Sequence, residues 1–313
     1  MDPFSTAVMA DPIGTLGPMR PDQAFDPHTA LLDWYGQYQR DLPWRRDPTP
    51  YRVLVSEIML HQTQVDRVVP FFDRFLQRFP TLAVLATASR AEVIGAWGGL
   101  GYNRRAVYLH ELARVAVERY GGVLPQDRSA LEALPGVGPY TAGAVLSIAF
   151  GQDEPAVDTN VERVIARYFG TGSIPKAALN QNARELVPPG QAREWNQALM
   201  DLGSSICRAR APRCLLCPLV PGCASAGDAA PMPKRKSDVF LESSRYYRGR
   251  MLAMLRGLAP GEGVPLSEIG QSLASQGVAE PKEGWGAIGQ RLADDGLAEV
   301  RHSAQETRIA LPS

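Results

Sequence analysis

The stretch LPGVGPYTAGAV, residues 134–145, constrains the fold of this chain more than any other. It lies between RSALEAL and YTAGAVLSIAF, two stretches with the apolar spacing of helices. Gly136 and Gly138 permit a tight turn and leave backbone N–H groups uncovered where the second helix starts. Such groups, with the helix dipole behind them, suit a phosphate oxygen. The stretch therefore predicts a helix–hairpin–helix, and a plain interhelical turn is the simpler alternative.

The whole of residues 27–225 has a helical pattern. Apolar residues recur three and four positions apart between short breaks that contain Gly or Pro, and no alternating strand pattern interrupts them. This predicts an all-α bundle of many short helices. The stretches that carry the pattern are ALLDWYGQY, YRVLVSEIML, VDRVVPFFDRFLQRF, RAVYLHELARVAVERY, TAGAVLSIAF, NVERVIARYF and WNQALMDLGSSI.

The two ends of the chain differ from this body. Residues 1–26 lack the charged and apolar regions of a secretory signal, and we interpret them as a disordered or artificial leader. Residues 226–241 are polar, basic and contain prolines, as linkers do. Residues 242–313 contain three helical patterns followed by LAEVRHS and ETRIALP, which alternate like strands of a hairpin. They predict a small winged-helix-like module.

Charge and hydropathy narrow the possible environments. Lys plus Arg and Asp plus Glu number 33 each, so no overall field attracts a polyanion, and a nucleic-acid site would need local clusters of arginine. The longest run of small apolar residues is too short to span a bilayer, and we expect no contact with a membrane. A cytoplasmic, monomeric protein is expected.

All four cysteines fall in one window, residues 207–223, with spacings of six, two and five residues. Clustered thiols in a cytoplasmic chain indicate a metal site rather than a disulfide framework. Four sulfur ligands suit either tetrahedral zinc or an iron–sulfur cluster. Arg208 and Arg210 lie in the loop between the first two ligands, where they could contact phosphate. The proposed ligands are Cys207, Cys214, Cys217 and Cys223.

These motifs together resemble the helix–hairpin–helix DNA glycosylases, and among them the MutY-like adenine glycosylases. The resemblance runs from residue 43 to residue 223, and in this family the cysteine spacing holds a [4Fe–4S] cluster. It implies a base excision repair enzyme that flips adenine out of double-stranded DNA and hydrolyses its glycosidic bond. The adenine would be mispaired with 8-oxoguanine or guanine. The stretches that carry it are PWRRDPTPYRVLVSEIMLHQTQV, GLGYNRRAVYLHELA, LPGVGPYTAGAV, AVDTNVERVIARYFG and WNQALMDLGSSIC.

Two carboxyl groups suit this chemistry. Glu57 shares a helix face with apolar residues, which should raise its pKa and suit a general acid near neutral pH. The resemblance implies that it protonates the base and later activates water. Asp158 directly precedes a helix, so it is a candidate N-cap, and a carboxylate there stays ionised and can stabilise a cationic sugar. Asn160 would organise the same site.

Tyr140 follows the hairpin at a position where the endonuclease III branch of the family has a lysine that forms a Schiff base. A tyrosine has no amine for this reaction. The resemblance therefore implies a monofunctional glycosylase with weak or no strand cleavage.

The resemblance also implies contacts with the lesion. Gln62 and Thr63 would lie beside the partner base, and Tyr102, with Leu100 nearby, would wedge into the duplex. Arg104 and Arg105 would hold the flanking phosphates.

The chain departs from the family pattern in two places. His61 stands where a glutamine is usual, beside the lesion-reading pair, and the NUDIX-like domain of many MutY proteins is replaced by the winged-helix-like module. Two other functions therefore stay open: a thymine or uracil mismatch glycosylase on the same scaffold, and a catalytically idle iron–sulfur protein that binds DNA.

Overall fold

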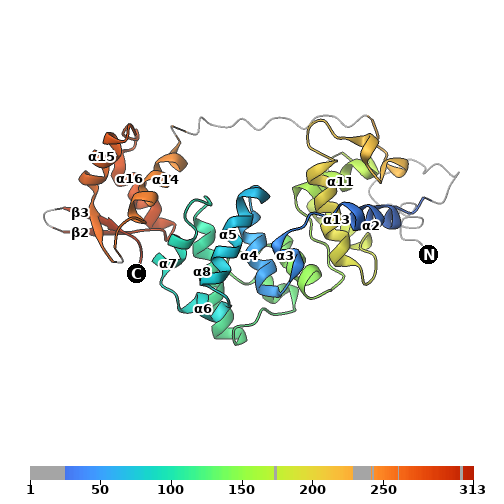
Figure 1. Cartoon of the computed structure of the whole chain (residues 1–313), viewed down its shortest axis with the longest axis horizontal. Coiled ribbons are helices and arrows are strands. Elements are labelled where there is room, and N and C mark those ends of the chain that lie inside the picture. The colour runs from blue at the N-terminus through green and yellow to red at the C-terminus, as the bar shows by residue number, and fades with distance from the viewer. Residues whose placement is uncertain (1–24, 173–174, 228–240, 242, 260, 304–305) are drawn as a thin grey trace. The chain divides into compact units, whose positions relative to one another are not determined.

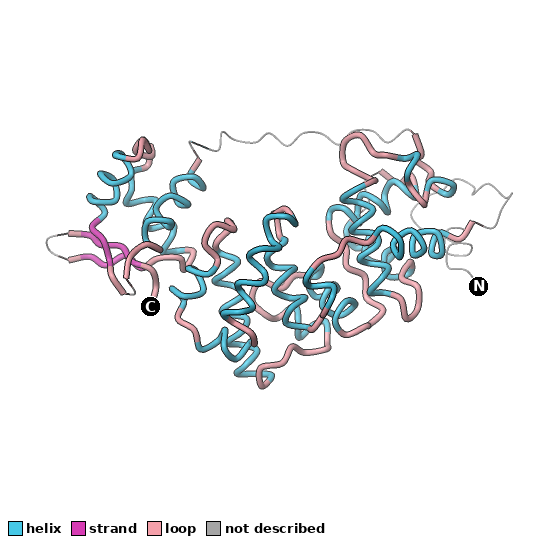
Figure 2. Tube along the Cα trace, viewed as in Figure 1, coloured by secondary structure: helices cyan, strands magenta, loops and turns pink. Residues whose placement is uncertain are grey.

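The computed structural model describes residues 25–313 except 173–174, 228–240, 242, 260 and 304–305. Most of the expected leader and linker therefore lies outside the described residues. Almost all regular structure in the described part is helical, and the strands occur only near the C-terminus (Figure 2). The predicted all-α body followed by a small mixed module is thus confirmed.

The chain divides into two compact units, each assembled from segments that are distant in sequence. The border falls inside one helix, α4, between Glu57 and Ile58. The module after residue 242 falls in the same unit as the middle of the body. The described residues of unit 1 belong to Met1–Glu57, Pro125–Ala133 and Val137–Lys234, and those of unit 2 to Ile58–Leu124, Leu134–Gly136 and Arg235–Ser313.

Unit 1 is a bundle of helices (Figure 1). Its apolar core includes Leu31, Val161 and Trp195. Capping side chains and glycines set the helix ends: Asp158 caps the start of α11, and Gly170 ends it in the left-handed conformation. The helices are α2 (Pro27–Tyr38), α3 (Pro43–Arg46), α4 (Pro50–Leu60, which continues into unit 2), α9 (Arg128–Glu132), α10 (Pro139–Ala144), the π-helical η2 (Val145–Ala149), α11 (Thr159–Phe169), α12 (Lys176–Glu185), α13 (Ala192–Ser205) and the 3₁₀ turns η3 (Cys214–Leu216) and η4 (Val220–Gly222).

The predicted helix–hairpin–helix is present as α9, a turn and α10. Gly136 has φ +77°, a conformation that favours glycine, and Gly138 is the N-cap of α10. After α10 the helix widens into η2, where Ser147 Oγ donates to the carbonyl of Gly143 at 2.7 Å. The sequence predicted one continuous α-helix here. A Cβ at Gly143 would lie 2.1 Å from the carbonyl oxygen of Pro155, so only glycine fits this close approach.

Unit 2 contains four helices from the body and the C-terminal module. In the module, β3 lies between β1 and β2 and is antiparallel to both, with Val264 and Val300 each opposite Ile309. The sequence predicted only β2 and β3, because β1 is a three-residue strand. The elements are α5 (Val65–Arg78), α6 (Leu82–Thr87), α7 (Arg90–Ala96), α8 (Arg104–Tyr120), α14 (Ser244–Leu255), β1 (Gly263–Pro265), α15 (Leu266–Ser275), α16 (Gly284–Asp294), β2 (Glu299–His302) and β3 (Thr307–Ala310).

Among the described residues, no helix is both long and apolar enough to span a membrane.

Candidate active site

Glu57 lies in α4 with its side chain turned into unit 1, where it is only 4% exposed. Its Oε2 accepts a hydrogen bond of 2.5 Å from the hydroxyl of Tyr140, which projects from α10. The two residues are 83 positions apart in sequence, and the hairpin brings them together. The pair is therefore a short, charge-assisted contact in an apolar setting.

Burial raises the pKa of Glu57 to about 7, because the carboxylate is deprived of water. The hydrogen bond from Tyr140 lowers the pKa, the negative charge of Asp158 raises it, and Arg45 lowers it. The pKa of Tyr140 lies well above its usual value because of burial and the two nearby carboxylates. Glu57 can thus carry or release a proton near neutral pH, while Tyr140 keeps its own.

Asp158 is the N-cap of α11, as the sequence predicts. Its Oδ1 accepts from the backbone N–H groups of Asn160 at 2.8 Å and of Val161 at 2.7 Å. Its Oδ2 accepts from the Nδ2 of Asn160 at 2.8 Å. These bonds hold the carboxylate in one orientation. Its negative charge raises the pKa of both Glu57 and Tyr140, and all three side chains belong to unit 1.

Arg163 connects this carboxylate to the cysteine loop. Its Nη2 donates to Oδ1 of Asn160 at 2.9 Å and to the carbonyl of Gly203 at 2.8 Å. Its Nε donates to the carbonyl of Cys207 at 2.8 Å. One guanidinium group, one helical turn after Asn160, therefore fixes both the amide that binds Asp158 and the backbone of the first cysteine.

A buried ion pair also lies in unit 1, and the sequence did not reveal it. Arg45 makes two hydrogen bonds to Asp201, of 2.8 and 2.9 Å, and Arg40 joins the same carboxylate. Burial would raise the pKa of Asp201, but the hydrogen bonds and positive charge of Arg45 and the charge of Arg40 hold it below its usual value. The side chains of Asp201 and Arg45 are 3% and 11% exposed. The paired guanidinium of Arg45 also acts on Glu57.

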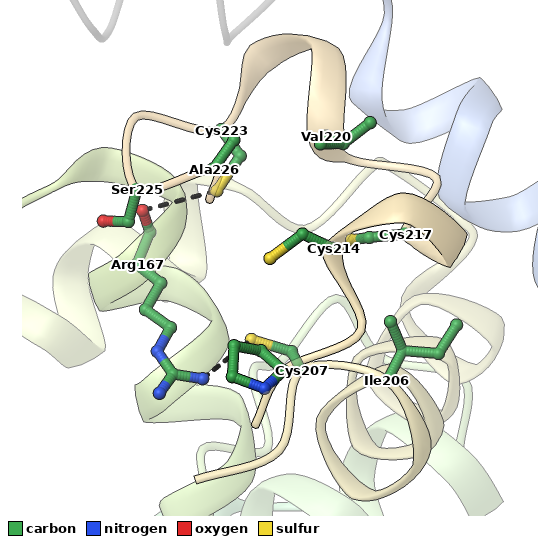
Figure 3. A pocket seen from close by; sticks show the side chains of 10 residues that line it. Arg167, Ile206, Cys207, Cys214, Cys217, Val220, Cys223, Ser225 and Ala226 are labelled. Atoms are coloured by element: carbon green, nitrogen blue, oxygen red, sulfur yellow. Dashed lines mark hydrogen bonds between the residues drawn. The ribbon is translucent and has the colours of Figure 1, made fainter. Parts of the chain in front are cut away.

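The four cysteines line one cavity that opens to solvent (Figure 3). Arg167 borders the same cavity, and its Nη1 lies 3.5 Å from the sulfur of Cys207. Within the described residues, no three His, Cys, Asp or Glu side chains are arranged to hold a single metal ion. A cavity lined by four thiols has the donor set of an iron–sulfur cluster, so the residues present fit that group.

The arginines of this loop point away from its core. Arg208 and Arg210 are exposed, and Nε of Arg208 donates to the carbonyl of Ser205 at 3.0 Å. Two leucines between Cys214 and Cys217 are exposed as well, Leu215 at 99% and Leu216 at 64%. The loop therefore presents both cationic and apolar side chains to solvent.

The candidate lesion-reading residues lie in unit 2. Gln62 and Tyr102 both have positive φ, +56° and +47°, which is uncommon for residues other than glycine. Gln62 is exposed, and Tyr102 is 42% exposed. Backbone strain of this kind is often found at functional sites.

Arg105 departs from the expected phosphate contact. Its Nη1 donates to the carbonyls of Ile58, Met59 and His61 at 2.6 to 2.8 Å, and its Nη2 donates to the carbonyl of Gly101 and to Oγ1 of Thr63 at 3.0 Å. Burial lowers its pKa to about 10. The guanidinium of Arg105 is therefore directed into the protein. Its hydrogen bonds connect the segment that contains Gln62 with the loop that contains Tyr102.

Two neighbouring candidates also differ from expectation. Leu100 is 2% exposed, so its side chain is part of the core and does not face DNA. Arg104 is exposed, but its Nη1 lies 3.3 Å from Asp295 and its guanidinium covers the ring of Tyr108. Tyr108 also packs against Gly136, where an added Cβ would lie 2.8 Å from the Cβ of Tyr108.

His61 lies beside the candidate lesion-reading residues. Burial and the positive charge of Arg105 lower the pKa of its imidazole.

Comparison with known proteins decides the family. Residues 55–189 match the model of the HhH-GPD superfamily of base excision DNA repair proteins. An adenine DNA glycosylase of Mycolicibacterium smegmatis is 44% identical over 232 residues, which cover 72% of this chain and 79% of the relative. The chain belongs to the adenine DNA glycosylases of the HhH-GPD superfamily.

Solved structures of this superfamily have the same fold. A thermostable thymine-DNA glycosylase superposes with a TM-score of 0.60 at 37% identity, covering 63% of this chain and 93% of that one. An endonuclease III trapped covalently on DNA gives a TM-score of 0.55 at 25% identity, covering 63% and 92%. The HhH-GPD match contains Glu57, Tyr140, Asp158 and Asn160, and the cysteines follow it.

Proposed function

We propose that this protein removes adenine from DNA by hydrolysing its N-glycosidic bond, as a base excision repair glycosylase. The observation that carries the proposal is the buried Glu57, with a pKa of about 7, held by Tyr140 and close to the capped Asp158. Breaking this bond needs an acid for the departing base and an anion for the sugar. The named adenine glycosylases among its relatives support adenine as the base.

Glu57 is the acid in this scheme. Oε2 of Glu57 accepts a hydrogen bond from the hydroxyl of Tyr140. The proton of the neutral carboxyl is therefore assigned to Oε1, the oxygen that can meet an extruded base. The proton passes to an adenine ring nitrogen as the bond between the base and C1′ breaks, and the bonding electrons leave with the base. The resulting Glu57 carboxylate then takes a proton from the water that attacks C1′.

Asp158 stabilises the sugar while it carries positive charge. Its carboxylate is fixed by the helix start and by Asn160, so it needs no rearrangement when the cation forms. With Tyr140 in place of an amine, no Schiff base forms, and the enzyme is monofunctional with at most weak strand cleavage.

The substrate is double-stranded DNA in which adenine is mispaired with 8-oxoguanine or guanine. Gln62, Thr63 and Tyr102 would meet the mispair, and the hairpin glycines and the exposed Arg208 and Arg210 would meet phosphates. We propose that the protein acts as a monomer on chromosomal DNA in the cytoplasm of a bacterium.

Cys207, Cys214, Cys217 and Cys223 would hold a [4Fe–4S] cluster. When bound, this group supplies four iron–thiolate bonds that brace the loop, and bond cleavage at the sugar is left to the carboxyl groups. The loop's arginines would then approach DNA from a rigid support.

A thymine mismatch glycosylase is the second candidate, because the thymine-DNA glycosylase is 37% identical to this chain. Base release from duplexes with A:8-oxoguanine, A:G, T:G and U:G pairs, at one stated salt concentration, separates the two. We expect release from the two adenine pairs only. Release of thymine or uracil at a comparable rate would refute the proposal, and binding without any release would indicate an idle DNA-binding protein.

A further inference from the structure

We propose that helix α14 of the C-terminal module is a positioning element for Tyr102, acting through Arg245 and Arg256. The inference rests on the proposed function, because Tyr102 is the side chain expected to enter the duplex. It gives the module a role in base extrusion that does not require the module to contact DNA.

Tyr102 needs support from its surroundings. It adopts φ +47° directly after Gly101, which has φ +82°, and a side chain with a Cβ is disfavoured in this region. Tyr102 is 42% exposed, so the core does not enclose its side chain. Contacts with neighbouring polar side chains therefore contribute to the position of the ring.

Arg245, in the first turn of α14, supplies one such contact. Its Nη1 donates to the hydroxyl of Tyr102 at 3.1 Å, and its guanidinium carbon lies 5.8 Å from the ring centroid. The guanidinium carbon of Arg105 lies 5.4 Å from the same centroid. Two cations thus hold the tyrosine, one from the body and one from the module.

Arg256, the C-cap of α14, fixes the loop that carries the tyrosine. Its Nε donates to the carbonyl of Ile94 at 3.1 Å, and its Nη2 donates to Oδ1 of Asn103 at 2.9 Å. The first partner lies in α7 before the loop, and the second directly follows Tyr102. The aliphatic part of Arg256 passes Gly98, where a Cβ would come within 3.4 Å of its Cδ. One side chain therefore spans the loop from end to end.

The apolar face of α14 keeps these arginines in place. Met251, Leu252 and Leu255 are fully or almost fully buried, and they share one core cluster with Ile94 and Val107 of the body. Burial of these apolar side chains stabilises the position of α14 more than the polar contacts alone would. The helix therefore serves as a fixed support for the loop.

The test uses the full-length protein with Arg245→Met, Arg256→Met and Arg256→Lys. Arg250→Met is the matched control, because Arg250 is on the same helix but bonds to Gln276 inside the module. Extrusion is followed by stopped-flow fluorescence of 2-aminopurine placed opposite guanine in a duplex. Adenine release is measured in single turnovers.

We expect Arg245→Met to slow extrusion about threefold, Arg256→Met to slow it about tenfold, and Arg256→Lys to restore part of the loss. The control should match the wild type. In a Tyr102→Phe background, which lacks the hydroxyl, Arg245→Met should have no further effect. Equal extrusion in the wild type and Arg245→Met, or full additivity with Tyr102→Phe, would overturn the inference.

Hydrogen exchange of the free protein separates this inference from the proposed function. Amides of residues 98–103 should exchange faster in Arg256→Met than in the wild type or in Arg250→Met, whatever the enzyme's substrate. Unchanged exchange would overturn the inference even if adenine release is confirmed. Because Arg245 is exposed, its replacement leaves the core intact and keeps the test valid if Arg256→Met fails to fold.

Discussion

The hydroxyl of Tyr140 donates to Oε2 of Glu57 at 2.5 Å, and it does so from the helix that follows the glycine hairpin. The hairpin thus contributes a hydrogen bond to the proposed acid in addition to its expected role at the DNA backbone. The bond favours the charged form of Glu57, whereas burial favours the neutral form. The balance places its pKa near the pH at which such an enzyme works.

Replacement of this acid tests the mechanism directly. We expect Glu57→Gln to slow adenine release at least about a hundredfold, because the amide cannot supply a proton. Binding to the mismatched duplex should persist, as a gel-shift assay would reveal. In the wild type, release should slow as the pH rises above about 7, where Glu57 loses its proton. Glu268→Gln, on an exposed position of α15, is the control.

The contribution of Glu57 to stability should depend on pH in the opposite sense to that of a glutamate whose pKa is lowered by a salt bridge. The pKa of Glu57 is raised from 4.5 to about 7, so the folded protein binds this proton more tightly than the unfolded chain. Its contribution to stability is complete below pH 4.5 and is lost as the pH rises through 7. A shift of this size corresponds to about 3 kcal/mol. Glu57→Gln should therefore raise the free energy of unfolding at pH 8 but not at pH 4.5, in urea titrations at both pH values.

Asp158 has two functions that substitutions can separate. Asparagine is as good an N-cap as aspartate, so Asp158→Asn should cost little stability while it removes the charge that stabilises the sugar. Asp158→Ala should lose the charge and also about 1 kcal/mol of stability. Thermal unfolding and single-turnover kinetics should thus give two variants that are equally inactive but differ in melting temperature. An active Asp158→Asn enzyme would contradict the assigned role.

The identity of residue 140 should decide whether a covalent intermediate forms. Borohydride should trap no wild-type enzyme on DNA, because tyrosine has no amine. Tyr140→Lys should give a trapped adduct, visible as a slower band on a denaturing gel. Tyr140→Phe should give none, and it should shift the decline in activity to higher pH, since the bond that lowers the pKa of Glu57 is lost.

The cysteine loop should colour the protein. Purified protein with a [4Fe–4S] cluster should be brown and absorb at about 400 nm. Cys214→Ala should lose this band and weaken DNA binding, because the arginines of the loop lose their support. A colourless protein that contains one zinc per chain would contradict the cluster.

Local patterns in the sequence predicted the parts of the site that depend on near neighbours. The hairpin, the buried face around Glu57 and the capping position of Asp158 all follow from residues within one or two helical turns. Patterns of this range do not reveal charge pairs such as Arg45 with Asp201, which are 156 positions apart. The same limit applies to Arg105: four of its acceptors lie 42 to 47 positions earlier, and its expected phosphate contact follows from the resemblance.

Two other differences also lie beyond the reach of local patterns. The position of Leu100 beside Tyr102 predicts a role next to the wedge, but its side chain is buried, in a loop where Gly99 and Gly101 have positive φ angles. The π-helical turn after α10 follows Gly143, which closely approaches the carbonyl oxygen of Pro155, and apolar periodicity does not reveal it.

The discontinuous segments of unit 1 bear on how the chain is synthesised. Leu31 of α2 is completely buried with Trp195 and Leu199 of α13, so it cannot reach its final surroundings until the ribosome has translated past these residues. The first helices must wait, with their apolar faces uncovered, while the whole middle of the protein emerges.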